Sequence, residues 1–338
     1  MNLRRSQLIT GAAASGAAFA LGGGQVAAAP AAEPVTTQLL WIKNVESAGF
    51  WLADANGYFR AAGIDAAMLA GGPGLSSVEA IVSAGRADVG VDLIERVVDA
   101  IAAGADLVVI GAIFQRNPAG LVSLPARPIR SAHDIIGKRI GLQQGARTYI
   151  DAILDLNHLP HDYTEVVVGF DPQPLVEGAC DGYLCFVTNQ PLTLAAHGVP
   201  HVVVSFEQLG LVDYGEVLFC TRASLRTRRA TLVRYLGALR RGWTENARDP
   251  ALAARLATQT YGAALGLDEA QQVAENRAQI PLTQSAATRA HGMLWVDEDT
   301  VKGPIYAGLR ATGRAKLPDV AQLIDPSLLR DAAPPGRG

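Results

Sequence analysis

Short apolar runs alternate with amphipathic stretches between residues 64 and 221, and this pattern predicts strands alternating with helices. The runs at 64–69, 107–114 and 182–186 have the length of strands and show no helical spacing of apolar positions. The stretch 147–156 lies between two such runs and has the length of a helix. Strands and helices in alternation over short connections are typical of a mostly parallel sheet with helices on both sides. We therefore predict an α/β fold.

The alternation begins a second time after residue 131, which predicts two lobes of similar construction. The expected strands are 64–69, 88–91, 107–114, 120–124, 139–142, 166–169, 182–186, 201–205 and 217–221. The expected helices are one ending at Gly63, then 76–85, 92–103 with Asp92 as its N-cap, 131–136, 147–156, 172–178, 189–196, 224–246, 250–260, 268–279 and 297–311. We expect the first lobe to comprise 35–119 and 215–325, the second 120–214, and the chain to end in a flexible tail at 326–338.

The stretch 40–51 reads as a short strand that runs into a turn carrying Trp41, Asn44 and Glu46. Strand ends beside helix starts are where open α/β sheets bind ligands, because side chains and free N–H groups converge there. A core tryptophan followed by an ordinary loop explains the same residues, so both interpretations stay open here. The glycine turn at Gly71–Gly74 is a second loop that would face a ligand through its N–H groups.

Residues 1–32 have the three-part layout of an export signal. Arg4 and Arg5 precede a weakly apolar stretch at 9–21, and small residues at 26–28 offer a cleavage site. The paired arginines favour the twin-arginine route. We therefore expect an exported, periplasmic protein with the signal removed and without stable membrane insertion.

Composition and missing motifs favour a small-molecule binding protein over an enzyme. The 338 residues carry a net charge of −3, which provides no basic field for nucleic acid. The histidines form no H-E-x-x-H pattern, and no G-x-S-x-G elbow is present. Three cysteines, Cys180, Cys185 and Cys220, match no metal pattern and are expected to be buried thiols, with a Cys180–Cys185 bridge as the alternative. We expect a monomer with neither metal nor cofactor.

Several ordered motifs carry a resemblance to a known family. They include Trp41-x-x-Asn44, Gly57-Tyr58-Phe59, Gly85-x-x-Asp88-x-Gly90, Thr188-Asn189-Gln190-Pro191 and Asp213-Tyr214-Gly215. From about residue 38 to 311 the chain resembles the substrate-binding proteins of ABC importers in the family shared by thiamine-precursor pyrimidine binders and alkanesulfonate binders. It looks most similar to the branch that binds thiamine-precursor pyrimidines or riboflavin. The resemblance implies a periplasmic binding protein of type II, with a ligand cleft between two open-sheet lobes, and an ABC permease with its ATPase as partner.

The resemblance also implies a site for a planar heterocycle. Members of this branch place a tryptophan and an asparagine beside the ring, which matches Trp41 and Asn44, and a hinge-side tyrosine and glutamate, which match Tyr214 and Glu216. Trp41 would stack on the ring, with Tyr214 or Phe114 as the opposing contact. The full set of candidate ligand-binding residues is Trp41, Asn44, Glu46, Phe50, Gly71, Gly72, Asp92, Phe114, Gln115, Gln144, Tyr149, Asn189, Tyr214 and Glu216.

Two other functions remain open. An alkanesulfonate, taurine or nitrate binder of the same fold would use N–H groups at 71–77 and Arg147. The same superfamily includes an enzyme that makes the pyrimidine from its own histidine and pyridoxal phosphate. The active lysine and histidine of that enzyme have no evident counterparts at the matched positions, and its cysteine-rich iron motif is missing, so we rank an enzyme based on Lys43 or a histidine third.

Overall fold

Two five-stranded mixed sheets organise the part of the chain that the computed structural model describes, residues 31–75 and 77–332. All but the last two residues of the predicted export signal, and the end of the predicted tail, lie outside the described residues. The first sheet has the order β2-β1-β3-β10-β4 and consists of β1 (Glu33–Gln38), β2 (Ile64–Leu69), β3 (Val89–Leu93), β4 (Leu107–Ala112) and β10 (Glu216–Thr221). The second has the order β7-β6-β8-β5-β9 and consists of β5 (Ala119–Ser123), β6 (Arg139–Leu142), β7 (Thr164–Val167), β8 (Gly182–Phe186) and β9 (Val202–Ser205). The prediction of an α/β fold with two open-sheet lobes is confirmed.

One strand in each sheet runs against its two neighbours. Strand β10 is antiparallel to β3 and β4, and β5 is antiparallel to β8 and β9. The chain enters the second lobe at β5 and returns to the first lobe at β10. The two crossing segments, 113–118 and 206–215, are hydrogen-bonded to each other, since the Asn117 N–H donates to the Asp213 carbonyl at 3.0 Å.

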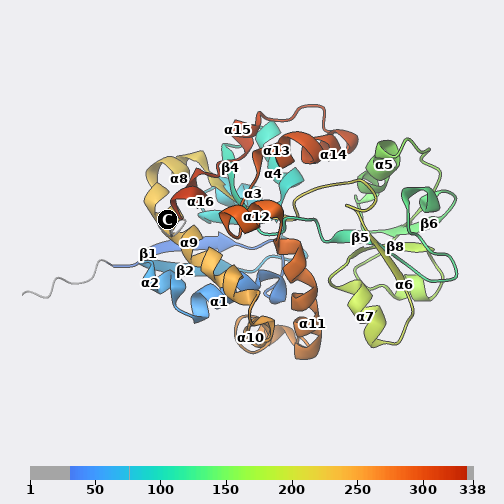
Figure 1. Ribbon diagram of the computed structural model, residues 1–338, viewed down its shortest axis with the longest axis horizontal. Helices are drawn as coiled ribbons and strands as arrows, with labels where there is room; N and C mark the ends of the chain where they lie inside the picture. The colour runs from blue at the N-terminus through green and yellow to red at the C-terminus, as the bar shows by residue number, and fades with distance from the viewer. Residues whose placement is uncertain (1–30, 76, 333–338) are drawn as a thin grey trace, which may run out of the picture. The chain divides into compact units, whose positions relative to one another are not determined.

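Helices cover both sides of the first sheet (Figure 1). One side carries α1 (Ala48–Ala55), α2 (Tyr58–Ala61), α9 (Arg229–Asn246), α10 (Pro250–Leu256) and α11 (Glu269–Gln279), and the other carries α3 (Val78–Ser83), α4 (Ile94–Ala102), α13 (Glu298–Thr300), α14 (Tyr306–Ala311) and α15 (Val320–Leu323). The remaining helices of this lobe are α8 (Arg222–Thr227), α12 (Ala286–His291) and α16 (Ser327–Asp331), with 3-10 turns η1 (Val45–Ser47), η4 (Ala263–Leu265) and η5 (Ile280–Thr283) and π-helical turns η3 (Ala257–Tyr261) and η6 (Val301–Ile305).

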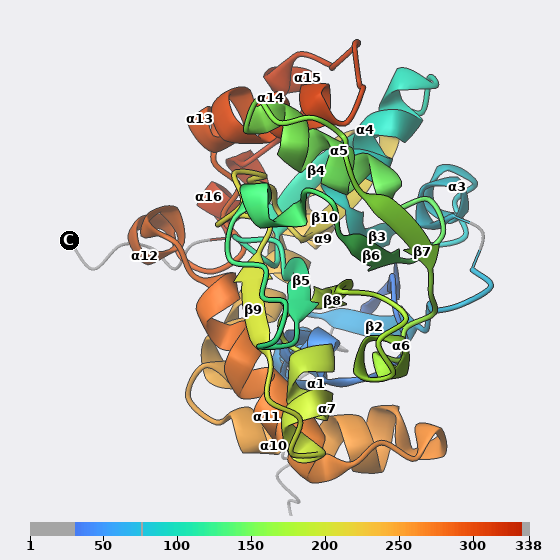
Figure 2. The ribbon, with the colours of Figure 1, turned by 90° about the vertical axis from the view of Figure 1, so that its right-hand side faces the viewer.

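The second lobe has fewer helices around its sheet. They are the 3-10 turn η2 (Ala132–Ile135), α5 (Arg147–Leu156), α6 (Gln173–Val176) and α7 (Gln190–Ala196). Seen from the second lobe, α5 lies near α14 and α7 near α11, and both pairs make backbone contacts (Figure 2). The lobes therefore meet on both sides of the cleft.

The core of the first lobe depends on a close approach of α1 and α9. A Cβ atom on Gly242 would lie 2.0 Å from the Gly49 carbonyl oxygen, and one on Gly49 would lie 2.4 Å from the Trp243 ring. Trp51, in the next turn of α1, stacks on Tyr261 with ring centroids 4.4 Å apart. Only glycine fits at both contact positions, so the two helices pack backbone to backbone.

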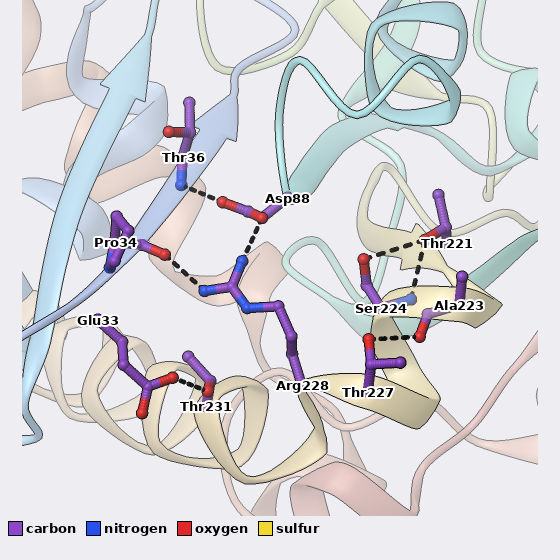
Figure 3. Close-up of polar contacts among 10 residues, drawn as sticks. All are labelled: Glu33, Pro34, Thr36, Asp88, Thr221, Ala223, Ser224, Thr227, Arg228 and Thr231. Atoms are coloured by element: carbon purple, nitrogen blue, oxygen red, sulfur yellow. Dashed lines mark hydrogen bonds and ion pairs between the residues drawn. The ribbon is translucent and has the colours of Figure 1, made fainter.

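A polar network joins α8 and α9 to the end of the first sheet where β1 begins (Figure 3). Arg228 pairs with Asp88 and donates to the Pro34 carbonyl at 2.6 Å, while the Thr36 N–H donates to Asp88 at 2.8 Å. The guanidinium of Arg228 therefore links the starts of β1 and β3 to helices α8 and α9. It lies at the opposite end of the strands from the edge described below.

Strands are predicted better than the segments around them. The expected strands 64–69, 139–142 and 182–186 and the helix 147–156 are confirmed residue for residue. The opening strand is wrong: β1 ends at Gln38, and the apolar residues after it form the loop to η1. The first helix is split because Gly57 adopts a left-handed φ of 68°.

Three further expectations about helices are corrected. Asp92 is not an N-cap, because its backbone pairs with Val217 inside the sheet and α4 begins at Ile94. The expected helix 224–246 is two helices, α8 and α9, which meet at Arg228. Helices α12, α15 and α16 were not predicted, since each is too short to show a periodic pattern. None of the described helices is both long and apolar enough to cross a lipid bilayer.

Candidate functional site

Four buried carboxyl groups gather at the edge of the first sheet that borders the second lobe. Strand β10 begins with Glu216 beside the end of β3, where Asp92 lies, and η1 and α11 add Glu46 and Glu275. All four are at most 8% exposed. We call these four residues the acidic edge. Within residues 31–75 and 77–332, no basic side chain forms an ion pair with Glu46, Glu216 or Glu275, and Asp92 has only the mostly exposed Arg96, at 3.3 Å.

Burial without compensating positive charge raises the pKa of every member of this edge. Burial raises the pKa of Glu46 to about 7, and burial together with the charge of Glu46 raises the pKa of Glu216 well above its ordinary value. Burial and then the Glu79 carboxylate raise the pKa of Asp92 to about 7. Burial and the charge of Glu46 raise that of Glu275 to about 8. Glu46 and Glu216 are close enough to hydrogen-bond each other, so one proton can be shared between them.

The 3-10 turn that carries Glu46 is fixed by its own cap and by α11. The Asn44 side-chain oxygen accepts from the Glu46 N–H at 3.1 Å, and the Asn44 carbonyl accepts from Trp51 Nε1 at 2.7 Å. Val45 bonds to Gln272 and Gln279 through its N–H and its carbonyl. The side-chain oxygen of Asn44 is therefore occupied within the chain.

The loop that carries Trp41 is held by the glycine turn. The Gly71 N–H donates to the Trp41 carbonyl at 2.8 Å and the Gly72 N–H donates to the Leu40 carbonyl at 2.9 Å. A Cβ on Gly71 would lie 2.2 Å from the Leu40 oxygen. The expectation that these N–H groups face a ligand is wrong, because the Trp41 loop already uses them.

Trp41 itself reaches the second lobe. Its ring is partly exposed and lies 5.4 Å from the ring of Phe170, centroid to centroid, in a tilted arrangement. Phe170 belongs to the second lobe and is 58% exposed, the largest exposed aromatic in that lobe's described surface. Two aromatic rings thus meet where the lobes approach each other.

Two other second-lobe side chains touch the first lobe near its carboxyl groups. The Tyr149 hydroxyl donates to Glu95 at 2.6 Å, and Asn189 lies close enough to hydrogen-bond to Glu275. Gln144 is exposed at the turn before α5, and the structure gives it no bond to the first lobe. Asn189 is therefore brought to the acidic edge and Tyr149 to Glu95, and Gln144 is brought to neither.

Four sequence candidates have structural roles instead. Phe50 and Phe114 lie in the core of the first lobe, at most 1% exposed. Tyr214 packs among helices α4 and α14, and its hydroxyl accepts from the Asp297 N–H at 3.0 Å. Gln115 bonds to the carbonyls of Ala112 and Trp295 and accepts from Ser285. All four side chains are packed or hydrogen-bonded within the chain, so none of them is free to bind a ligand.

Three residues at this junction were missed by the sequence analysis. Glu95, Phe170 and Glu275 lie at a helix start, in a loop and within a helix, where such residues are ordinary. Only their convergence in space distinguishes them, and no spacing in the sequence signals it. Among the residues the structure describes, no cluster of three or more His, Cys, Asp or Glu side chains is arranged to hold a metal ion. The three cysteines are buried and unbridged.

Comparison with known proteins supplies the family. The model of the family described as NMT1/THI5 like matches residues 44–253, more than half of the chain. The protein belongs to the NMT1/THI5-like family. The matched region includes Asn44, Glu46, Asp92 and Glu216 of the site, and it ends before Glu275.

Individual relatives in this family are distant. The chain is 27% identical over 198 residues to the 4-amino-5-hydroxymethyl-2-methylpyrimidine phosphate synthase of Schizosaccharomyces pombe, covering 55% of this chain and 57% of that protein. It is 28% identical over 190 residues to the synthase of the same name from Legionella pneumophila, covering 55% and 59%. The match thus spans less than two thirds of either curated relative.

A solved structure shows the same fold over most of the NMT1/THI5-like chain. The periplasmic aliphatic sulphonate binding protein SsuA from Escherichia coli has a TM-score of 0.67 and 16% identity, covering 86% of this chain and 91% of that one. At this identity the likeness concerns the fold alone. The fold is that of periplasmic binding proteins, as predicted.

Proposed function

We propose that this protein is the extracytoplasmic solute-binding component of an ABC importer and that its solute is a planar heterocycle bearing amino groups. The acidic edge carries this proposal. Glu46 and Glu216 form a buried pair of hydrogen-bond acceptors without a basic partner among the described residues. Exocyclic amines and protonated ring nitrogens are the donors that satisfy such a pair.

Trp41 supports the heterocyclic part of the proposal. Trp41 is partly exposed, lies in the loop that leads to Glu46 and meets Phe170 of the second lobe, so its ring can offer a flat apolar contact to a heterocycle. Aromatic stacking contributes about 0.5–1.5 kcal/mol beyond the burial of area. A buried acceptor left without a donor costs about 1–3 kcal/mol, so the carboxyl pair would reject rings that lack amines. Trp41 would provide affinity and the acidic edge specificity.

The family and the fold support the solute class and the role. Both curated relatives are named for an aminopyrimidine phosphate, and the fold is that of periplasmic binding proteins. A thiamine-precursor pyrimidine or a flavin-type ring is therefore the first solute to test. An importer component would deliver it to a permease by closing its lobes about the crossing segments 113–118 and 206–215.

A sulfonate binder of the same fold is the second candidate, favoured by the E. coli neighbour. The groups it needs are occupied in this chain. The N–H groups of Gly71 and Gly72 bond to the Trp41 loop, and Arg147 lies between Asp151 and Glu165 at 3.3 and 3.6 Å. An anion in the cleft would also meet the acidic edge, whose carboxylates repel it.

A synthase is the third candidate, because both curated relatives carry that name. Two of the six histidines have partners within the chain: His161 pairs with Asp155, and His291 stacks on Trp295. Product formation from a pyrimidine precursor by the isolated protein, lost on Lys43→Ala, would favour this candidate over transport.

The proposal is tested by titrating the purified mature protein with an aminopyrimidine, with riboflavin and with an alkanesulfonate, following tryptophan fluorescence and the melting temperature. We expect saturable binding of an amino-heterocycle at micromolar concentration or below, about −8 kcal/mol. Glu216→Gln should weaken this binding at least tenfold, and Trp41→Ala should both weaken it and remove most of the fluorescence change.

The exposed Glu177→Gln serves as the matched control and should leave the affinity unchanged. Binding of the sulfonate alone, or binding of the heterocycle that Glu216→Gln leaves intact, would contradict the proposal.

A further inference from the structure

A small pocket between the lobes, beside the crossing segments, holds a second pair of buried carboxyl groups. It encloses about 80 Å³ and is lined from the first lobe by Glu95 and α14, from the second by Tyr149 and Phe186, and from a crossing segment by Asp213. Sites that bury a whole drug-sized ligand measure about 300–1,000 Å³. The pocket therefore has room for a substituent of a few atoms, not for a ring system.

Two carboxyl oxygens of the residues that line this pocket have no hydrogen-bond partner. They are Glu95 Oε2 and Asp213 Oδ1, each fully buried as an atom, and Glu95 is 3% exposed as a residue. The other Glu95 oxygen accepts from the Tyr149 hydroxyl at 2.6 Å. The two carboxyl groups are close enough to hydrogen-bond each other, and burial together with the charge of Glu95 raises the pKa of Asp213 well above its ordinary value. Either a shared proton or a positive group between them would satisfy both oxygens.

The basic side chain that lines this pocket is paired with a third carboxylate. Arg314 lies at the rim of the pocket, where it donates to both oxygens of Asp99 at 2.7 Å. Two carboxylates and a tyrosine are too few ligands for Ca²⁺ or Mg²⁺, which take six or more oxygens. A compact organic cation with several N–H donors fits better, because it can donate to both orphan oxygens at once.

The pocket is linked to the acidic edge through Asp92. The charge of Asp92 raises the pKa of Glu216 on one side, and the charge of Glu95 raises that of Asp92 on the other. Leu93, the residue after Asp92, lines the pocket. Asp92 and Glu95 are three residues apart, so the pocket and the acidic edge adjoin at the end of β3.

We propose that the pocket formed by Glu95, Asp213 and Tyr149 is a subsite for a positively charged amino group, so that the solute carries a protonated amine on a short arm beyond its ring. This inference rests on the proposed function, since it assumes that the ring binds in the cleft between the lobes. The amine would replace the proton shared by the two carboxyls.

The experiment compares an aminomethylpyrimidine with its hydroxymethyl analogue by calorimetric titration of the mature protein at pH 7.5. We expect the amine to bind at least tenfold more tightly than the alcohol. Glu95→Gln, whose amide oxygen still accepts from Tyr149, should reduce that ratio to near one, and Asp213→Asn should do the same. The exposed Asp65→Asn should preserve the ratio.

Equal affinity for the two compounds in the wild type, or a preference for the amine that survives both Glu95→Gln and Asp213→Asn, would overturn the subsite while leaving the proposed function intact. If neither compound binds, the proposed function fails, and methylammonium chloride is then compared with sodium chloride at equal ionic strength. A rise in melting temperature with methylammonium that is lost in Glu95→Gln supports the subsite by itself. No rise overturns it.

Discussion

Glu46, Asp92, Glu216 and Glu275 are ionisable groups that the fold keeps away from water and from positive charge. A carboxyl whose pKa is higher in the folded than in the unfolded state binds more protons when folded. Stability therefore falls as the pH rises from the unfolded value, 4.5 for the glutamates and 3.8 for Asp92, to the folded one. For Glu46 and Asp92 that window ends at about 7, and for Glu275 at about 8.

The first prediction follows from this sign. The melting temperature of the ligand-free protein should fall between pH 5 and pH 8. Glu275→Gln should make this fall smaller, by an amount that corresponds to about 1–3 kcal/mol in the free energy of unfolding. Differential scanning calorimetry at several pH values measures it, with Glu177→Gln as the exposed control. A melting temperature that rises steadily over this range would refute the interpretation. A bound amine should flatten the decline, because it supplies the positive charge that the carboxylates lack.

At the scale of elements, the contact between α1 and α9 allows a second prediction with a control in the same helix. Gly242→Ala would place a methyl group 2.0 Å from the Gly49 carbonyl and force the helices apart. Overpacking of this kind costs about 1–3 kcal/mol. Gly237→Ala, also in α9, meets its nearest neighbour at 3.6 Å and should be neutral or stabilising by up to about 1 kcal/mol through helix propensity. Urea unfolding of both variants measures the difference, and equal stability would be the contrary result.

The loop between β1 and η1 provides the third prediction. Gly71→Ala would push a methyl group into the Leu40 carbonyl and displace the loop that carries Trp41. We expect affinity for the heterocycle to fall at least tenfold while urea unfolding shows a smaller loss of stability. Gly169→Ala is the control, since it lies beside Phe170 and a Cβ there meets nothing within 4 Å. Unchanged affinity in Gly71→Ala would show that the position of Trp41 does not matter for binding.

The sequence predicts elements where local pattern decides them, and it fails where tertiary contacts decide. Strand β8 and helix α5 have clear patterns and were predicted residue for residue. Strand β1 was missed because its residues, EPVTTQ, are mostly polar, and pairing with β2 and β3 makes them a strand.

For the candidate site the division is similar. Trp41, Asn44 and Glu216 follow from the family pattern and Glu46 from the turn that carries it, and the structure puts Glu46 and Glu216 side by side. Phe50 follows from the aromatic turn and Tyr214 from the family pattern, yet the structure places both in the core, because an aromatic ring suits a core as well as a ligand. Glu275 could not have been found, because only the packing of α11 against η1 brings it to the site.

For the whole molecule, individual side-chain contacts join the two lobes, and we expect them to control closure. The Tyr149–Glu95 hydrogen bond and the Trp41–Phe170 contact each join the two lobes. The fourth prediction is that Tyr149→Phe favours the open form. Small-angle X-ray scattering of the ligand-free variant should give a larger radius of gyration than the wild type, and a saturating solute should restore it. Tyr163→Phe removes a hydroxyl bonded to Asp151 within the second lobe and should not change the radius.

The antiparallel strands β5 and β10 also determine the order in which the chain can fold. Every strand of the second sheet lies between residues 119 and 205, so that sheet can assemble from one continuous segment. Among the described strands β4 pairs only with β10, more than 100 residues later, and its bridge from Val109 to Ile324 also awaits the end of the chain. During synthesis β4, which is fully apolar, therefore stays unpaired until the second lobe has been synthesised. During that interval β4 is the segment most exposed to wrong partners and most in need of protection by a chaperone.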